Sequence, residues 1–153
     1  MAGHDRYGKA VMTQAAGSDW SASGIPLQVR FGAGPPGRID GMVGSRIAVE
    51  IESREPKQVH SAVLHLVLHK APRKLLVLIP AHNEPATVRQ CRAIFQRLLA
   101  DNRRFRVVRL EGTGPRTRPK PQDVVMVRRA LRQLGWRPHP GTIFESSTVI
   151  ARN

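Results

Sequence analysis

The most informative segment of the sequence is Ile47-Ala48-Val49-Glu50-Ile51-Glu52. Its polar and apolar side chains alternate from Val49 onward, and successive side chains of a β-strand point to opposite faces. The alternation predicts a strand over residues 46–52 with Glu50 and Glu52 on one face. We therefore expect two carboxylates to stand side by side on a sheet.

A third acidic residue, Asp40, precedes this strand. Segment 41–45 is short enough for a hairpin connection, which would lay a strand over 38–42 antiparallel beside the next one. Three clustered carboxylates repel one another, and burying them costs several kcal/mol per ion unless a cation offsets their charge. Mg²⁺ or Mn²⁺ would resolve this repulsion, because such ions prefer oxygen ligands and leave room for phosphate oxygens. We predict a metal site at Asp40, Glu50 and Glu52.

This order of residues resembles the PD-(D/E)XK nuclease superfamily. In that family an Asp at the end of one strand precedes an acidic residue on the next, a Lys two positions later, a helix and another buried strand. Asp40 and Glu50 match the two acidic positions, whereas Glu52 stands where Lys is usual. Gln58 is similar to a Gln or Lys in the family's helix, although it could equally be a polar residue on an open helix face. The resemblance covers roughly residues 5–110.

The resemblance implies a restriction-endonuclease-like α/β fold and metal-dependent hydrolysis of phosphodiester bonds. Asp40 and Glu50 would be direct metal ligands. Glu52 could act as a general base or bind a second ion, but it cannot supply the positive charge of the usual Lys. Lys57 or Arg54 could supply that charge from nearby in the sequence. The alternative is a solvated strand face on which the acids are spaced by chance.

The net charge predicts a polyanionic partner. Lys and Arg total 25 against 11 Asp and Glu, which gives +14, and the excess is dominated by Arg. Such an excess attracts nucleic acid through counterion release. With two Trp and one Tyr in the chain, recognition of single strands by base stacking is disfavoured. Duplex DNA is the expected partner, although net charge alone does not separate DNA from RNA or from an acidic membrane surface.

Basic residues gather in the C-terminal third of the chain. Segment 112–121 is a basic, Pro-rich loop, and segment 122–134 has the pattern of an amphipathic helix. Their density favours phosphate contacts over a merely solvated charged face. With Arg54, the residues that we predict to contact DNA are Arg116, Arg118, Lys120, Arg128, Arg129 and Arg132.

The order of the expected elements predicts one α/β domain with a mixed central sheet flanked by helices, comprising a core at about 5–110 and a basic loop and C-terminal helix at 112–153. Apolar periodicity places helices at 5–16, 57–69, 85–100 and 122–134. Strands are expected at 27–31, 38–42, 46–52, 75–79, 105–110 and, as a short closing strand, 142–150. The Gly- and Pro-rich segment 32–37 is expected to be a hairpin tip.

The helix expected at 57–69 carries further polar and apolar residues. His65 and His69 lie at i, i+4 spacing, which invites a zinc interpretation together with His60, but hard oxygen ligands dominate nearby. We expect solvated or DNA-facing histidines instead. Leu64 and Leu68 widen the apolar surface of this helix. Another element or the second subunit of a homodimer would cover them equally well.

The single cysteine, Cys91, rules out an internal disulfide and fits a reducing cytoplasm. It falls within an amphipathic helix pattern, which predicts a buried structural thiol. The sequence contains no run of about 18 apolar residues and no signal-peptide pattern at its start. We therefore expect a soluble cytoplasmic protein with no membrane partner.

Three functions remain open from the sequence. The first is a Mg²⁺-dependent DNA endonuclease, acting as a monomer or a homodimer. The second is a binding module that keeps the nuclease-like fold without chemistry, which Glu52 at the usual Lys position favours. The third is an RNA-associated or ribosome-associated basic protein.

Overall fold

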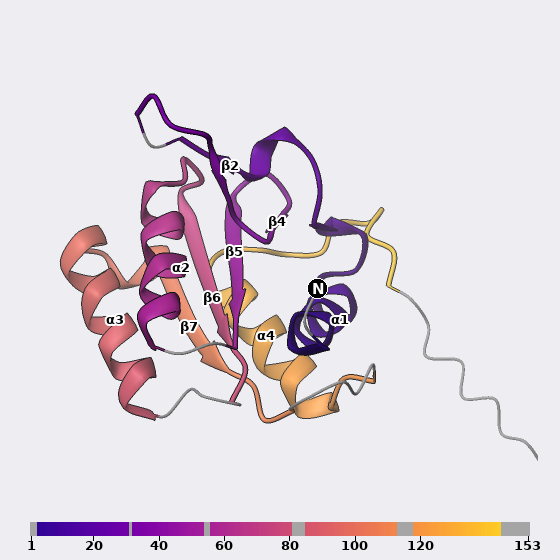
Figure 1. The fold of residues 1–153 in the computed structure, drawn as a ribbon. Helices are drawn as coiled ribbons and strands as arrows, with labels where there is room; N and C mark the ends of the chain where they lie inside the picture. The colour runs from indigo at the N-terminus through magenta and orange to yellow at the C-terminus, as the bar shows by residue number, and fades with distance from the viewer. Residues whose placement is uncertain (1–2, 31, 54–55, 81–84, 113–117, 145–153) are drawn as a thin grey trace, which may run out of the picture.

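The protein is an α/β sandwich of three layers, seen here in a computed structural model that describes residues 3–30, 32–53, 56–80, 85–112 and 118–144. The predicted mixed central sheet flanked by helices is confirmed (Figure 1). The helices are α1 (Gly3–Ala16), α2 (Pro56–Leu68), α3 (Pro85–Leu99) and α4 (Pro121–Gln133). In spatial order, the strands of the central sheet are β1 (Trp20–Ser21), β4 (Gly41–Val43), β5 (Ile47–Glu52), β6 (Arg73–Leu78) and β7 (Phe105–Arg109).

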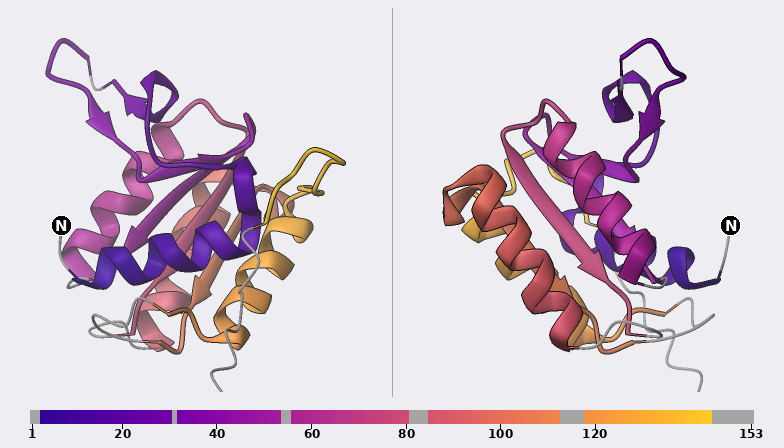
Figure 2. Two further views of the ribbon diagram at one scale, coloured as in Figure 1. Left: turned by 90° about the vertical axis from the view of Figure 1, so that its right-hand side faces the viewer. Right: turned by 60° about the vertical axis from the view of Figure 1, so that its left-hand side comes forward.

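Strand direction changes within the sheet. β1, β4 and β5 pair antiparallel, whereas β5, β6 and β7 pair parallel. Parallel neighbours need crossover connections, and α2 and α3 provide them on one face of the sheet. α1 and α4 cover the other face (Figure 2). β5 is therefore the strand at which the antiparallel and parallel parts meet.

The face under α1 and α4 holds the larger apolar core. Val49 and Ile51 of β5 point into it, together with Tyr7 and Val11 of α1 and Val127 of α4. A Cβ added at Gly8 would lie 2.3 Å from Cγ2 of Ile51, so α1 can lie this close to β5 only because residue 8 is glycine. α4, which lies outside the nuclease-like core expected at about 5–110, also contributes to this cluster.

The face under α2 and α3 holds a second core. Ala48 of β5 points into it with Val59 and Val63 of α2, and Phe95 of α3 stacks on Phe105 of β7 with 5.2 Å between ring centroids. The other large members are Leu66, Leu76 and Leu78. The alternation along β5 thus places Glu50 and Glu52 on the α2 side of the sheet, as the sequence pattern requires.

Cys91 belongs to this second core. Its side chain is fully buried, and burial raises the pKa of the thiol to about 11. The prediction of a buried structural thiol is confirmed. Lys74 is also buried on this side, and its Nζ donates to the backbone oxygen of His69, which stabilises the C-terminal end of α2.

The strand expected at 27–31 is not part of the central sheet. Only Gln28–Val29 (β2) forms a strand, and it pairs antiparallel with Gly37–Arg38 (β3) in a separate two-stranded ribbon. The connection between them contains residues 32–36, and Gly37 already pairs with Val29, so the predicted hairpin tip is confirmed except for its last residue. Alternation over five residues could not distinguish a short ribbon from a central strand.

The strand expected at 38–42 is split in two. The N–H of Ile39 donates to the backbone oxygen of Leu27 at 2.9 Å, whereas the N–H of Asp40 donates to that of Val49 at 3.1 Å. The chain therefore leaves the ribbon after Ile39 and joins β5 from Asp40 onward. The predicted hairpin between β4 and β5 is confirmed, with Gly44 in its turn at φ 56°.

Two predictions at the ends of the chain also differ from the structure. β1, which has only two residues, was not predicted, because so short a strand shows no alternation. Residues 142–144 are not a strand, and the rest of the expected closing strand, 145–150, lies outside the described residues. None of the helices in the described parts of the chain is both long and apolar enough to cross a bilayer.

Candidate functional site

A pocket of about 340 Å³ lies at the C-terminal end of β5, between this strand and α2. Four of the five predicted catalytic residues line it, and these are Asp40, Glu50, Glu52 and Gln58. The fifth, Lys57, is in the first turn of α2, and its side chain lies outside the described atoms. Residues from two strands and one helix thus meet at one site.

Asp40 occupies the fork at which the chain leaves the ribbon for the central sheet. Its Oδ2 accepts a hydrogen bond from the N–H of Ile51 at 2.7 Å. The Asp40 carboxylate therefore accepts a hydrogen bond from the backbone of β5 just beyond the last residue that pairs with β4. This bond holds the carboxylate against the strand segment that carries Glu50.

Glu50 is 6% exposed, and its environment opposes ionisation. Burial is the main cause that raises its pKa to about 10, followed by the hydrogen bond to Asp40 and the charges of Asp40 and Glu52. At neutral pH Glu50 therefore keeps its proton in the protein alone. Its Oε1 lies 3.0 Å from Nδ1 of His65, so this contact is a hydrogen bond to an uncharged carboxyl group rather than an ion pair.

Glu52 lines the same pocket but is turned toward the local backbone. Its Oε1 accepts a hydrogen bond from the N–H of Ser53 at 2.9 Å. Among the described residues, no three His, Cys, Asp or Glu side chains are grouped closely enough to hold a metal ion. Asp40, Glu50 and Glu52 thus line one pocket without forming such a group, and the metal site stays a prediction. Asp40 and Glu50 remain as a pair, and one or two carboxylates suffice for Mg²⁺.

His65 is a site residue that the sequence analysis did not assign to the pocket. It was expected to be solvated or to face DNA, and the structure places it half-buried at the pocket beside Glu50. Gln58, Ser61 and His65 form the polar stripe of α2, and all three line the pocket. The spacing of that stripe was the available signal, since residues at i, i+3 and i+7 share a helix face.

His60 and His69, the other two histidines of segment 57–69, contact different residues. This arrangement disfavours a shared zinc site, as the hard oxygen ligands nearby in the sequence already did. Nε2 of His60 lies 3.2 Å from Oε1 of Gln90. His69 is buried, and its Nε2–H donates to the backbone oxygen of Pro26 at 2.5 Å. The expectation of a solvated or DNA-facing His69 is therefore wrong, because this side chain joins the end of α2 to the segment before β2.

Arg128, which was predicted to contact DNA, is half-buried and hydrogen-bonded to backbone oxygens of α1. Its Nε and Nη2 donate to the backbone oxygens of Ala15 at 3.2 Å and Gln14 at 2.9 Å. Its guanidinium also lies over the ring of Phe144, 5.4 Å from the centroid. These contacts join α4 to the C-terminal end of α1.

Of the remaining predicted DNA contacts, those that the structure describes do not line the pocket. Arg129 and Arg132 are exposed on α4, which covers the opposite face of the sheet from α2 (Figure 2). Arg118 is exposed, and Lys120 is half-buried with its backbone N–H donating to Oη of Tyr7 at 3.0 Å. Arg54 and Arg116 lie outside the described residues.

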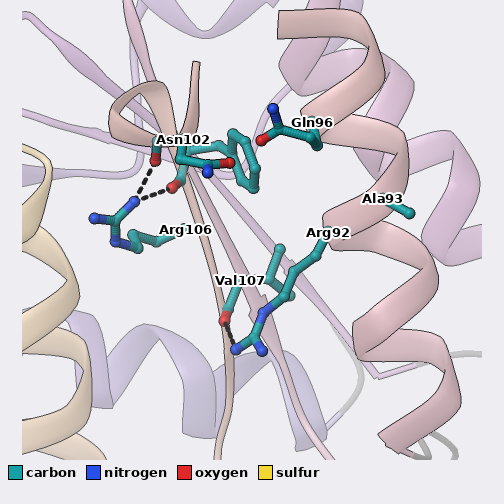
Figure 3. Close-up of a pocket in the computed structure, with 7 residues that line it drawn as sticks. Arg92, Ala93, Gln96, Asn102, Arg106 and Val107 are labelled. Atoms are coloured by element: carbon teal, nitrogen blue, oxygen red, sulfur yellow. Dashed lines mark hydrogen bonds between the residues drawn. The ribbon is translucent and has the colours of Figure 1, made fainter. Parts of the chain in front are cut away.

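A second pocket, of about 460 Å³, lies between α3 and the outer edge of β7 (Figure 3). Its arginines are already engaged with backbone oxygens of that edge. Nη2 of Arg92 donates to Val107 at 3.2 Å, and Nη1 of Arg106 donates to Phe105 at 2.7 Å and to Asn102. These two arginines therefore protect the outer edge of β7, and they are not available as cations for a ligand.

Replacing both arginines should expose this edge. In Arg92→Ala/Arg106→Ala, the backbone oxygens of Phe105 and Val107 lose their donors. We expect the free energy of unfolding to fall by about 1 to 2 kcal/mol. Aggregation on warming should begin at a lower temperature, as followed by light scattering. Arg89→Ala/Arg97→Ala removes the same charge from exposed positions of α3 and is the matched control. Identical scattering curves for both variants would contradict edge protection.

Comparisons with family models, curated proteins and solved structures found no match to this chain. The function is therefore inferred from the residues of the site and their surroundings.

Proposed function

We propose that the protein is a divalent-metal-dependent endonuclease that hydrolyses phosphodiester bonds of duplex DNA and has a restriction-endonuclease-like fold. The observation that carries this proposal is the carboxyl pair in the pocket beside α2. Asp40 is oriented by the N–H of Ile51, and the pKa of the neighbouring Glu50 is raised to about 10. Perturbed carboxyl groups gathered in a pocket are typical of functional sites.

The order of the elements supports the proposal. Asp40 immediately precedes β4, Glu50 and Glu52 lie on the adjacent β5, and α2 and the buried β6 follow. This is the succession on which the resemblance to the nuclease superfamily depends. Glu52 remains a departure from it, since it stands in the place of the usual Lys.

The donor set suits a hard cation. Asp40 and Glu50 would hold the ion, and a cation would take the place of the proton that Glu50 keeps in the protein alone. Mg²⁺ or Mn²⁺ bound there would stabilise charge at the scissile phosphate and make a bound water more acidic. A cation would also offset the repulsion between the two carboxyl groups.

Other side chains of the pocket fit supporting roles. His65, 3.0 Å from Glu50, would keep that carboxyl group oriented as its proton leaves. Glu52 would accept a proton as general base, and Gln58 would orient water from the exposed face of α2. Arg38 also lines the pocket and would supply positive charge in place of the usual Lys.

Nicking of supercoiled plasmid tests the proposal. The protein should nick in Mg²⁺ or Mn²⁺ and be inactive in a chelator. Asp40→Asn should reduce the rate by about 100-fold or more, because an amide is a far weaker ligand than a carboxylate. Glu111→Gln, which removes an exposed carboxylate, is the matched control and should cut at the wild-type rate. Cutting by Asp40→Asn at the wild-type rate would end the proposal.

A binding module without chemistry is the second candidate. Glu52 at the usual Lys position favours it, as does the lack of a three-ligand metal cluster in the described parts of the chain. It predicts salt-dependent duplex binding with no nicking in either metal and no heat of Mg²⁺ binding by calorimetry. Competition between duplex RNA and duplex DNA separates both candidates from an RNA-associated protein.

A homodimer also remains a proposal. Leu64 and Leu68 of α2 are 50% and 49% exposed, so α3 does not cover them. A second copy could pack on this surface. Sedimentation of Leu64→Ser/Leu68→Ser beside the wild-type protein would show whether it does.

A further inference from the structure

A third pocket, of about 500 Å³, lies at the opposite ends of β5 and β6 from Glu50 and Glu52. Three arginines line it from separate segments of the chain. Arg46 comes from the turn between β4 and β5, Arg73 is the first residue of β6, and Arg137 follows α4. The parallel register places Ile47 beside Arg73, so the first two segments are held together by the sheet.

Two of these arginines have hydrogen-bonding capacity to spare. The side chains of Arg46 and Arg73 donate no hydrogen bond to any other residue in the described ranges. Arg137 uses Nη1 to donate to the backbone oxygens of Arg132 at 2.9 Å and Trp136 at 2.8 Å, which fixes its guanidinium at the end of α4. A fixed cation and two available ones therefore share one pocket.

The one carboxylate that lines this pocket among the described residues is hydrogen-bonded to side chains other than the arginines. Asp19 accepts hydrogen bonds at Oδ2 from Nε1 of Trp136 at 2.9 Å and from Oγ1 of Thr142 at 3.2 Å. Its Oδ1 lies 3.1 Å from Nε2 of His139. The N–H of Gly141 donates to Nδ1 of this histidine at 3.0 Å, so the proton sits on Nε2 and points to Asp19. Asp19 thus holds the wall of the pocket together. Its charge, and that of Asp101, which interacts with Arg73, offset only part of the charge of the three arginines.

We propose that this pocket binds a phosphate group of a nucleic-acid backbone. Planar guanidinium groups bind phosphate oxygens in pairs, and three of them around one cavity leave an uncompensated positive charge. Free phosphate carries the same chemistry, so the test includes it separately. The choice of duplex DNA as the probe rests on the proposed function, but binding through this pocket needs neither metal nor cleavage.

Fluorescence anisotropy with a labelled DNA duplex in a chelator tests the proposal. Compared with the wild-type protein, Arg46→Gln/Arg73→Gln should bind about 10-fold more weakly at low salt, and the slope of log affinity against log salt should fall by about 2. Arg89→Gln/Arg97→Gln loses the same charge from exposed sites on α3 and should change the affinity by less than about 3-fold. Arg46→Lys/Arg73→Lys, which keeps the charge, should retain part of the binding.

Equal weakening in the two glutamine variants would assign the effect to net charge and overturn the proposal. Titration calorimetry with inorganic phosphate distinguishes the other source. Phosphate binding that Arg46→Gln/Arg73→Gln abolishes, with duplex affinity unchanged, would also overturn it, since the pocket would then take free phosphate. Thermal melting of each variant verifies folding. Duplex binding in the chelator and nicking in Mg²⁺ are measured separately, so failure of the nuclease proposal and failure of this one are separate results.

Discussion

Glu50→Gln should stabilise the protein at alkaline pH while it removes the response to divalent metal. The uncharged carboxyl group of Glu50 is adjacent to Asp40 and His65. Glutamine has nearly the same shape, and its amide can donate to Asp40 while its oxygen accepts from His65. The substitution therefore keeps the hydrogen bonds of the protonated glutamate without its capacity to ionise.

The direction of the pH effect follows from proton binding. The pKa of Glu50 rises from 4.5 to about 10 on folding, so between these values the folded state binds one proton more than the unfolded state. The stabilisation by this group is complete below pH 4.5 and is lost as the pH rises toward 10. Because glutamine does not titrate, the unfolding free energy of the variant at pH 8 should exceed that of the wild-type protein by up to about 5 kcal/mol, since each pH unit above 4.5 contributes about 1.4 kcal/mol.

Urea unfolding in a chelator between pH 6 and pH 9 measures this difference, with Glu111→Gln as the control. Adding Mg²⁺ should raise the stability of the wild-type protein and release a proton, but it should do neither in Glu50→Gln. The variant should not cut DNA. If the two proteins show the same dependence of stability on pH, Glu50 is ionised in the folded protein, and the physical basis for the metal site is removed.

The sequence was sufficient for the elements that carry local patterns. β5 alternates, the segment of β6 is a continuous apolar run, and α2 begins at a proline and shows a periodic stripe. Each pattern lies within a dozen residues and reflects one buried face. The hairpin that brings Asp40 beside β5 was likewise predicted from the length of its turn.

The parts that the sequence did not predict depend on contacts between distant segments. The fork at Asp40 requires Ile39 to pair with Leu27, and no local pattern distinguishes that bond from the next one in a ladder. The place of His65 depends on its distance from Glu50 across two elements. Arg128 looks like its exposed neighbour Arg129 in the sequence, but it is held by backbone oxygens of α1.

Asp123 is the strongest case of such a distant contact, and Asp123→Ala should be the most destabilising of the substitutions considered. Its side chain is fully buried in the first turn of α4. Tyr7 donates to Oδ2 at 2.5 Å across a separation of 116 residues, and the N–H groups of Glu111 and Gly112 donate at 2.7 and 2.9 Å. One carboxylate therefore joins α1, α4 and the segment after β7.

Removing that carboxylate leaves three donors without acceptors near the core. We expect Asp123→Ala to lose about 3 to 5 kcal/mol of unfolding free energy, because each buried donor left unpaired costs about 1 to 3 kcal/mol. The surroundings have little room to adjust, since even a Cβ at Gly112 would lie 2.0 Å from Oη of Tyr7. Urea unfolding at neutral pH measures the loss.

Two further variants identify the cause. Asp123→Asn keeps the volume but places an amide donor against one of the three donors, so it should lose nearly as much stability as the alanine variant. Tyr7→Phe removes a single donor and the acceptor for the N–H of Lys120, and it should lose about 1 to 2 kcal/mol. Stability of Asp123→Asn equal to the wild-type value would show that packing, and not the accepted hydrogen bonds, holds α4 to α1 and to the segment after β7.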